Sequence, residues 1–279
     1  MKIRIGYSPC PNDTFIFDAL VNGKIDSEGY QFEPVLADVE ELNRMALEGE
    51  LDVTKISVGA YPLVANNYVM LDSGAALGNG VGPLLVTASG NFDPQDGKAR
   101  VAIPGVSTTA NLLLTLFMPQ LKNKQPMLFS DIETAVLDGI CDAGVLIHAG
   151  RFTYQQKGLK LAFDLGQAWE EKLQMPLPLG CICASRKLDK SHIMKLDSMI
   201  SASVRFAFQH PESSQEYVSM HAQEMDPSVV KQHIDLYVNE YSVALGTRGR
   251  AAISTMIETC LQHNGQSKIE LPIFSVDLT

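Results

Sequence analysis

A turn with two prolines follows the first apolar segment and constrains the fold more than any other feature of the chain. Residues 3–7 are apolar enough for a buried strand, and Ser8-Pro-Cys-Pro-Asn-Asp-Thr-Phe-Ile-Phe17 follows them directly. Pro9 and Pro11 exclude a regular helix or a central strand across the turn. A helical pattern then begins, and we expect a helix over 13–22.

The polar side chains of this turn are candidates for ligand binding. Asn12 or Asp13 can cap the following helix by accepting a backbone hydrogen bond. Ser8 and Asn12 stand between a strand end and a helix N-terminus, a combination that can hold an anion. The alternative is a proline-rich turn that caps a helix and binds nothing.

Length and composition indicate an ordinary globular protein. The chain has 279 residues, of which 46% are hydrophobic and 19% charged, enough for one large domain or two smaller ones. No apolar run reaches the roughly 18 residues that span a membrane. The N-terminal residues lead straight into a strand and do not form a signal peptide. We therefore expect a cytoplasmic protein without membrane insertion.

Charge and cysteine content restrict the partners. The net charge of −10 argues against a nucleic-acid partner, which would need a basic face. A small-molecule carboxylate could still bind through helix N-termini, hydroxyls or one well-placed Lys. Cys181 and Cys183 should point the same way from one strand, and no second Cys or His pair at ligand spacing suggests a metal. The oligomeric state stays open.

Strands alternate with helices, which predicts an α/β fold with mostly parallel strands. Before a polar segment that ends at Lys98, we expect strands over 3–7, 31–36, 52–56, 68–73 and 81–88, and helices over 13–22, 39–48 and 58–66. After it, we expect strands over 101–103, 143–147, 161–165 and 179–184 and a buried helix over 109–118. The remainder is mostly helical, with starts near Ser191, Pro211, Pro227 and Thr247.

An internal repeat indicates two equivalent halves. Segments 38–52 and 130–142 each carry a polar cap, a Glu three residues later, apolar residues at helical spacing, a glycine and then an aspartate. Each aspartate starts a strand, and these strands end at Ser57 and His148. Two such halves would offer polar residues to a ligand bound between them.

His148 is the strongest candidate for catalysis. It ends the apolar run over 143–147, and a histidine side chain, with a usual pKa of about 6.5, suits a general base near neutral pH. A hydrogen-bonded structural histidine is the alternative. We expect the remaining five histidines to be solvated, namely His192, His210, His221, His233 and His263.

Two further groups could bind a carboxylate. Thr108 and Thr109 open the buried helix, where hydroxyls and N–H groups can hold an anion or simply cap the helix. Lys55, Ile56 and Ser57 end the third strand. A lysine there needs an anion, a cleft, or a buried acid such as Asp13 or Asp52.

Other motifs give weaker indications of a functional site. The glycine-rich segment 77–82 lacks the spacing of a dinucleotide site and suggests a hinge or a close-approach loop. Asp164 and Glu170, near Trp169, suit a turn and a helix face better than a pair of acidic catalysts. No Walker, HExxH or GxSxG motif is present.

With these residues assembled, the chain closely resembles the 1,4-dihydroxy-6-naphthoate synthase family of the futalosine route to menaquinone. The matching segments run in order along the chain: 8–17, 54–57, 76–83, 108–110, 147–148, 151–154, 164–166, 169–170 and 176–180. The first of these segments is highly specific. The helical tail, with Tyr237-Val-Asn239, matches more weakly.

The resemblance implies a two-lobed fold like that of type II periplasmic binding proteins, with the ligand cleft between the lobes. Lobe I would comprise 1–95 and 190–279, and lobe II, inserted in it, 96–189. The resemblance also implies a lyase that needs no cofactor or metal and converts cyclic dehypoxanthinyl futalosine to 1,4-dihydroxy-6-naphthoate and a small sugar-derived fragment. His148 matches the family's base, and 55–57 and 108–109 match its substrate contacts.

Two alternatives belong to other classes. A solute-binding protein for a small organic anion would normally carry an export signal and would not need His148. Chorismate dehydratase resembles this family in fold and pathway, but its opening motif differs from Ser-Pro-Cys-Pro-Asn-Asp.

Overall fold

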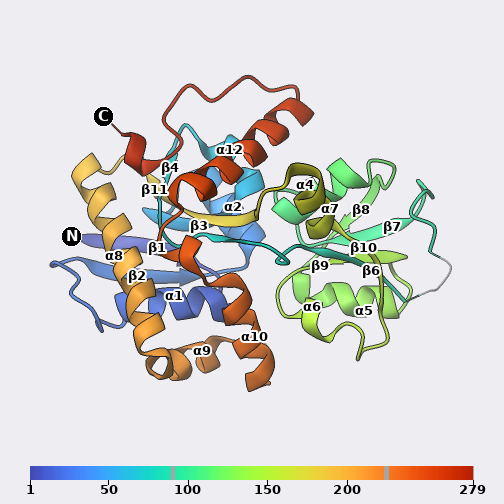
Figure 1. Cartoon of the computed structure of the whole chain (residues 1–279), viewed down its shortest axis with the longest axis horizontal. Helices are drawn as coiled ribbons and strands as arrows, with labels where there is room; N and C mark the ends of the chain where they lie inside the picture. Colours follow the sequence, from blue (N-terminus) through green and yellow to red (C-terminus); the bar gives the residue numbers. More distant parts are fainter. Residues whose placement is uncertain (89–91, 223–225, 279) are drawn as a thin grey trace. The chain divides into compact units, whose positions relative to one another are not determined.

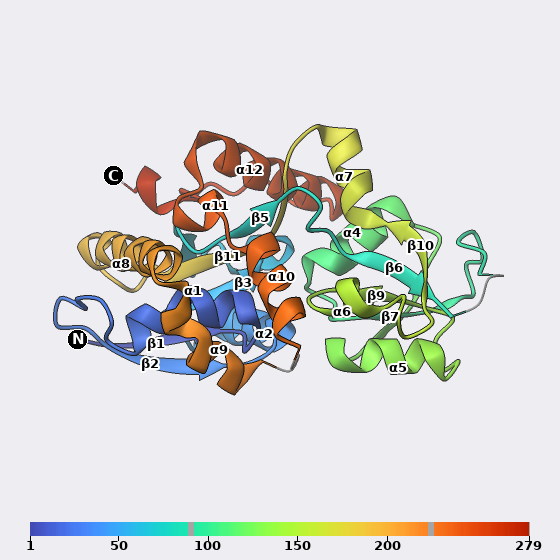
Figure 2. The same ribbon diagram turned by 60° about the horizontal axis from the view of Figure 1, so that its bottom comes forward.

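The chain forms two α/β units, one inserted in the other (Figures 1 and 2). The computed structural model describes residues 1–88, 92–222 and 226–278. Unit 1 comprises Met1–Gly78 and Pro178–Thr279, and unit 2 comprises Asn79–Leu177. The chain therefore changes units earlier than the expected boundaries at 95 and 189. Asn91, near the first expected crossing, lies outside the described residues.

The sheet of unit 1 combines parallel and antiparallel strands in the order β2-β1-β3-β11-β4. Strand β1 (Lys2–Tyr7) is parallel to both β2 (Gln31–Leu36) and β3 (Val53–Ser57). Strand β11 (Leu177–Ser185) is antiparallel to β3 and to β4 (Tyr68–Met70), and β5 (Ala76–Gly78) also pairs with β11. The helices of this unit are α1 (Pro11–Val21), α2 (Val39–Glu48), α3 (Tyr61–Val64), α8 (Lys190–Gln209), α9 (Gln215–His221), α10 (Pro227–Tyr237), α11 (Glu240–Val243) and α12 (Gly246–His263).

The sheet of unit 2 repeats this plan in the order β8-β7-β9-β6-β10. Its strands are β6 (Leu84–Thr87), β7 (Arg100–Ile103), β8 (Asn123–Pro126), β9 (Ala143–Leu146) and β10 (Lys160–Asp164), and its helices are α4 (Thr109–Phe117), α5 (Ile132–Leu137), α6 (Gly150–Thr153) and α7 (Leu165–Leu173). Strand β7 is parallel to β8 and β9, whereas β6 is antiparallel to β9 and β10. Because β6 pairs within this sheet, the residues after Gly78 belong to unit 2.

The internal repeat is confirmed by matching contacts in the two units. Asp52 accepts a hydrogen bond from the Arg4 backbone N–H at 2.8 Å, and Asp142 accepts one from the Arg100 N–H at 2.7 Å. Each aspartate thus joins the start of its own strand to the neighbouring strand. The glycine that ends each preceding helix, at 49 and 139, has a φ of 70°, as a left-handed C-cap requires.

The caps of the two repeated helices differ. Asp38 accepts hydrogen bonds from the N–H groups of Glu40 and Glu41, as predicted. The predicted cap at Ser130 is wrong, because Ser130 lies inside a short 3-10 turn, Phe129–Asp131, and α5 begins at Ile132. Strand β8 was not predicted, since three of its four residues are polar and three are exposed.

Helix α1 begins two residues earlier than expected. Pro11 is its first residue and Cys10 occupies the N-cap position without a side-chain cap, so the prediction of a cap at Asn12 or Asp13 is wrong. Proline is well tolerated at the first helical position, because the N–H that it lacks would have no partner within the helix. Asp13 therefore lies inside the helix, where its carboxylate can bind other partners.

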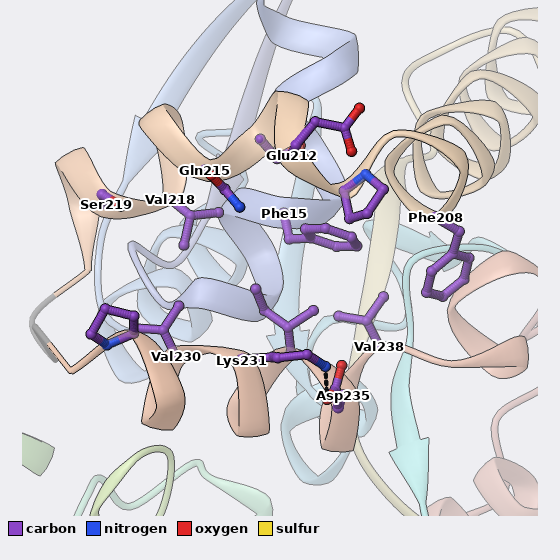
Figure 3. A pocket seen from close by; sticks show the side chains of 14 residues that line it. Phe15, Phe208, Glu212, Gln215, Val218, Ser219, Val230, Lys231, Asp235 and Val238 are labelled. Atoms are coloured by element: carbon purple, nitrogen blue, oxygen red, sulfur yellow. Dashed lines mark hydrogen bonds and ion pairs between the residues drawn. The ribbon is translucent and has the colours of Figure 1, made fainter.

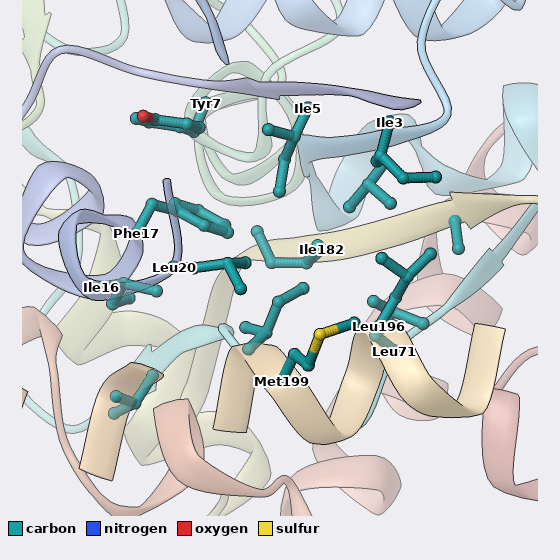
Figure 4. Packing of buried hydrophobic residues seen from close by; sticks show 14 of the residues in the cluster. Ile3, Ile5, Tyr7, Ile16, Phe17, Leu20, Leu71, Ile182, Leu196 and Met199 are labelled. Atoms are coloured by element: carbon teal, nitrogen blue, oxygen red, sulfur yellow. The ribbon is translucent and has the colours of Figure 1, made fainter. Parts of the chain in front are cut away.

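The core of unit 1 lies between its sheet and helices α1 and α8 (Figure 4). Ile3 and Ile5 of β1 and Ile182 of β11 pack with Leu20 and Leu196, and all five side chains are buried. Helix α1 also packs against α9 and α10. Every residue from Pro11 to Leu20 is consequently buried, polar ones included.

Candidate functional site

Asp13 is the centre of a buried hydrogen-bond network beneath the proline-rich turn. Its carboxylate is fully buried, and Oδ2 accepts hydrogen bonds from Ser8 N–H at 3.1 Å and Ser8 Oγ at 2.6 Å. Oδ1 accepts one from Asn12 Nδ2 at 2.7 Å and forms an ion pair with Lys55 Nζ. The network thus joins the turn, α1 and β3, and it brings together Ser8, Asn12 and Lys55, three of the predicted site residues.

Lys55 therefore has a protein counter-ion. The sequence left open an anion, the cleft or a buried acid as its partner, and Asp13 is that acid; Asp52 instead holds Arg4. The Lys55 stem lies over Gly180, where an added Cβ would come within 3.0 Å of Lys55 Cε. A side chain at position 180 would therefore require the Lys55 stem to shift by a few tenths of an ångström.

Ser57 is held at the end of β3 by a residue that the sequence did not single out. Asn43 of α2 accepts a hydrogen bond from Ser57 N–H at 2.9 Å and donates one to Ser57 Oγ at 3.2 Å. Asn43 is buried among the apolar residues of its helix. In the sequence, a polar Asn at a position of the helix that should be apolar is the signal that could have identified it. The Ile56 side chain is fully buried.

His233 was also missed, and the prediction that it is solvated is wrong. The side chain is 1% exposed, and its Nε2 lies 2.9 Å from Asn12 Oδ1. Of the other four histidines predicted to be solvated, His210 and His263 are exposed, whereas His192 and His221 are half-buried. The Nδ1 atom of His192 is hydrogen-bonded to the Tyr30 hydroxyl at 2.5 Å. The one signal for His233 was its helical spacing to Tyr237, with which it forms the buried side of α10.

Thr108 and Thr109 lie at the start of α4 in unit 2. Thr108 is the N-cap: its hydroxyl accepts a hydrogen bond from Asn111 N–H at 3.2 Å and donates one to Gly105 O at 2.8 Å. The predicted capping role is thus confirmed, and it uses the only hydroxyl proton of Thr108. The buried Thr109 begins the helix, where backbone N–H groups have no acceptor within the helix and favour an anion.

His148 follows β9 in an unusual backbone conformation. The strand ends at Leu146, and His148 has a φ of 58°, in the left-handed region. The residue is half-buried, and the centroid of its ring lies 4.7 Å from the centroid of the Phe129 ring, with an angle of 53° between the two planes. Such a conformation costs about 1–3 kcal/mol in a residue other than glycine and is frequent at functional sites.

The glycine-rich segment is a close-approach loop, as predicted. A Cβ on Gly82 would lie 2.1 Å from the Gly166 Cα, so neither position accepts a side chain without a shift of the backbone. Gly80 N–H donates to Glu170 Oε1 at 2.7 Å, and Arg151 donates to Gly82 O at 2.7 Å. Several separate segments of the family resemblance therefore meet in unit 2.

A cavity of about 920 Å³ lies in unit 1 among α1, α8, α9 and α10 (Figure 3). Its lining is mainly apolar and includes Phe15, Phe208 and Val230, with Lys231 and Asp235 paired at one side. None of the predicted site residues lines it. The cavity and the Asp13 network therefore share no residue.

Cys10 is unsuited to nucleophilic chemistry despite its place in the turn. Burial raises the pKa of its thiol to about 12, and the hydrogen bond with Ser8 opposes this shift only partly. The thiol thus stays protonated near neutral pH, and a thiol is a far weaker nucleophile than a thiolate. Cys181 and Cys183 point the same way, as predicted, with their sulfurs 3.8 Å apart.

The five cysteines are all buried thiols, and none of them forms a disulfide. This burial predicts a large difference in thiol titration between the native and the unfolded protein. We expect the native protein to react with Ellman's reagent at least about tenfold more slowly than the urea-unfolded protein, because reactivity follows exposure and thiolate character. Unfolded protein should release five equivalents of the coloured thiolate. Rapid release of one equivalent from native protein would contradict the described burial.

The described residues contain neither a candidate metal cluster nor a candidate membrane-spanning helix. Across 1–88, 92–222 and 226–278, no cluster of three or more His, Cys, Asp or Glu side chains could hold a metal ion. In the same ranges, no helix is both long and apolar enough to cross a membrane.

Two α/β units of the same strand plan, one inserted in the other, define the periplasmic-binding-protein fold. The Candida albicans CA3427 gene product, described as having that generic fold, aligns with a TM-score of 0.66 at 13% identity over 98% of this chain and 97% of that one. A likeness at this identity concerns the fold alone. The fold class expected from the sequence is thus confirmed.

The chain belongs to the menaquinone biosynthesis family, whose model matches residues 3–262. A protein named 1,4-dihydroxy-6-naphtoate synthase from Thermus thermophilus is 46% identical over 254 residues, covering 91% of this chain and 92% of that one. A protein of the same name from Streptomyces coelicolor is 44% identical, with 91% of each covered. AF1704 from Archaeoglobus fulgidus has a TM-score of 0.87 at 37% identity over 95% of this chain and 98% of that one. The family expected from the sequence is confirmed.

Proposed function

We propose that this enzyme of menaquinone biosynthesis is a 1,4-dihydroxy-6-naphthoate synthase. It acts as a carbon–carbon lyase that releases 1,4-dihydroxy-6-naphthoate and a small sugar-derived fragment from cyclic dehypoxanthinyl futalosine. The observation that carries the proposal is the 46% identity over nearly the whole length of a relative with that name. The geometry around His148 and α4 supports it with a candidate base and a candidate carboxylate site.

His148 acts as the general base in this proposal. Its imidazole takes a proton from the substrate, and the electron pair left behind forms a ring double bond as the bond to the sugar-derived fragment breaks. The fragment leaves with the electron pair of that bond and receives a proton from the imidazolium. Aromatisation of the new ring favours release, and this elimination needs no external oxidant or reductant.

The substrate carboxylate binds at the N-terminus of α4. Because the Thr108 hydroxyl already donates to Gly105, the donors for a carboxylate are the Thr109 hydroxyl and the first N–H groups of the helix. Lys55 and Ser57 of β3, with Ser8 and Asn12, supply further polar contacts. Asp13 is the only acceptor for the Lys55 ammonium among the described residues, so the other N–H donors of this ammonium can serve a ligand.

Removing both threonine hydroxyls should weaken substrate binding more than turnover. For Thr108→Val/Thr109→Val we expect KM to rise about tenfold and kcat to change less than about threefold, since the carboxylate is not the reacting centre. The lost cap should also lower stability by about 1 kcal/mol. Steady-state kinetics and thermal unfolding measure both effects. Thr108→Ser/Thr109→Ser, which keeps the hydroxyls, is the control, and a wild-type KM in the double Val variant would exclude the contact.

One assay separates the proposal from its alternatives. Purified protein is incubated separately with cyclic dehypoxanthinyl futalosine and with chorismate, and the products are followed by absorbance and mass. We expect 1,4-dihydroxy-6-naphthoate from the first substrate and no reaction with the second. Consumption of chorismate would favour the dehydratase, and binding without turnover would favour a solute-binding protein.

A further inference from the structure

The side chains of Asn12 and Asp13 connect His233, on α10, to Lys55, on β3. His233 Nε2 lies 2.9 Å from Asn12 Oδ1, and Asn12 Nδ2 donates to Asp13 Oδ1 at 2.7 Å. Asp13 Oδ1 in turn holds the Lys55 ammonium. All four side chains are at least nine-tenths buried, so these contacts are shielded from competition with water.

The chemistry of the groups determines which atom donates and which accepts in each of these hydrogen bonds. A carboxylate only accepts hydrogen bonds, so the amide of Asn12 must turn Nδ2 toward Asp13 and Oδ1 toward His233. An amide oxygen facing Nε2 requires a proton on that nitrogen. His233 therefore fixes the orientation of the Asn12 amide, and the amide supplies one of the donors that fix the Asp13 carboxylate.

The orientation of Asp13 determines where Lys55 points. Oδ2 is occupied by the two donors of Ser8, so Oδ1 is the atom left for Asn12 and Lys55. If the Asn12 amide turned over, its oxygen would face Oδ1 and repel it. The carboxylate would then shift, and the ammonium bound to it would move as well.

We propose that His233 is a positioning residue that acts through Asn12 and Asp13 to hold the Lys55 ammonium where it meets the anionic substrate. This role rests on the proposed function, in which Lys55 contacts the substrate. His233 itself touches neither the substrate nor the reacting atoms. Its loss should therefore affect KM and leave kcat nearly unchanged.

The kinetic test compares two substitutions of His233. His233→Leu removes the N–H donor, and we expect a KM about tenfold higher with kcat within about threefold, since a misplaced charged donor weakens binding by roughly this factor. His233→Gln can place an amide N–H near the position of Nε2 and should keep KM within about threefold of wild type. His192→Leu, which removes another histidine hydrogen bond of unit 1, is the matched control with wild-type KM.

A double substitution tests whether His233 acts through Asn12. If it does, His233→Leu/Asn12→Leu should have the same KM as Asn12→Leu alone, because the second change removes a connection that is already broken. The proposal would be overturned if the KM increases of the two single variants multiplied in the double variant. It would also be overturned by a wild-type KM in His233→Leu, or by a KM in His233→Gln as high as in His233→Leu.

A spectroscopic measurement tests the connection without any turnover. Long-range ¹H–¹⁵N spectra of the wild-type protein should show a proton on His233 Nε2, and an unprotonated Nε2 would overturn the proposal even if every variant failed to fold. If wild-type protein did not convert cyclic dehypoxanthinyl futalosine, the proposed function would fail, while the protonation of Nε2 would still decide the hydrogen-bond chain.

Discussion

Replacing His148 with Ala should lower kcat at least about a hundredfold, the usual size of a general-base contribution. The protein should stay folded, because the side chain is half-buried and follows the end of β9. Substrate KM should change little, since the imidazole acts mainly in the transition state. Steady-state kinetics with cyclic dehypoxanthinyl futalosine, together with thermal unfolding, measures these three quantities.

The backbone of His148 calls for a second variant. Alanine at a φ of 58° is strained, so His148→Ala could also disturb the local backbone. Asparagine adopts this conformation more readily and has no basic nitrogen. His148→Asn should therefore lose as much turnover as His148→Ala, whereas His263→Ala, at an exposed position, should keep full turnover. Near-wild-type kcat in both His148 variants would exclude this residue as the base.

The buried pair of Asp13 and Lys55 should give the largest effect on stability. Asp13→Leu leaves the Lys55 ammonium buried without its counter-ion, and we expect the free energy of unfolding to fall by about 3–5 kcal/mol. Lys55→Met should cost less, because Asp13 would still accept hydrogen bonds from Ser8 and Asn12. Urea unfolding followed by circular dichroism measures both changes.

The double variant Asp13→Leu/Lys55→Met provides the decisive comparison. It removes both charges, so we expect it to be more stable than Asp13→Leu alone. The exposed pair Lys2–Glu33 is the matched control, and Lys2→Met should cost no more than about 1 kcal/mol. If the double variant were less stable than Asp13→Leu, the unpaired Lys55 charge would not be the main cause of the lost stability.

Elements with strong local signals were predicted well from the sequence. Strand 31–36 and helix 39–48 have the predicted bounds. The signals for the helix are all local, because its apolar spacing lies between the Asp38 cap and the glycine at 49. Helix α1 was predicted to start too late, because Pro11 was treated as a barrier instead of a first helical residue. Strand β8 has no apolar pattern that could have revealed it.

Properties that depend on distant partners were not accessible. The apolar residues of β6 predict a strand but not which sheet it joins, and this pairing sets the boundary of unit 2. The contact between Asn12 and His233 spans 221 positions, and the spacing within α10 alone cannot identify the partner. For the same reason the sequence suggested several partners for Lys55, and only the packing of α1 on the sheet selects Asp13.

The central claim is that the chain releases 1,4-dihydroxy-6-naphthoate by an elimination that needs no added co-reactant. The most direct test is a mass balance on purified protein incubated with cyclic dehypoxanthinyl futalosine in buffer without nucleotide, flavin or added metal. We expect each molecule of substrate consumed to yield one molecule of 1,4-dihydroxy-6-naphthoate and one sugar-derived fragment. A reaction that proceeds only after a redox cofactor is added, or a product other than 1,4-dihydroxy-6-naphthoate, would contradict it.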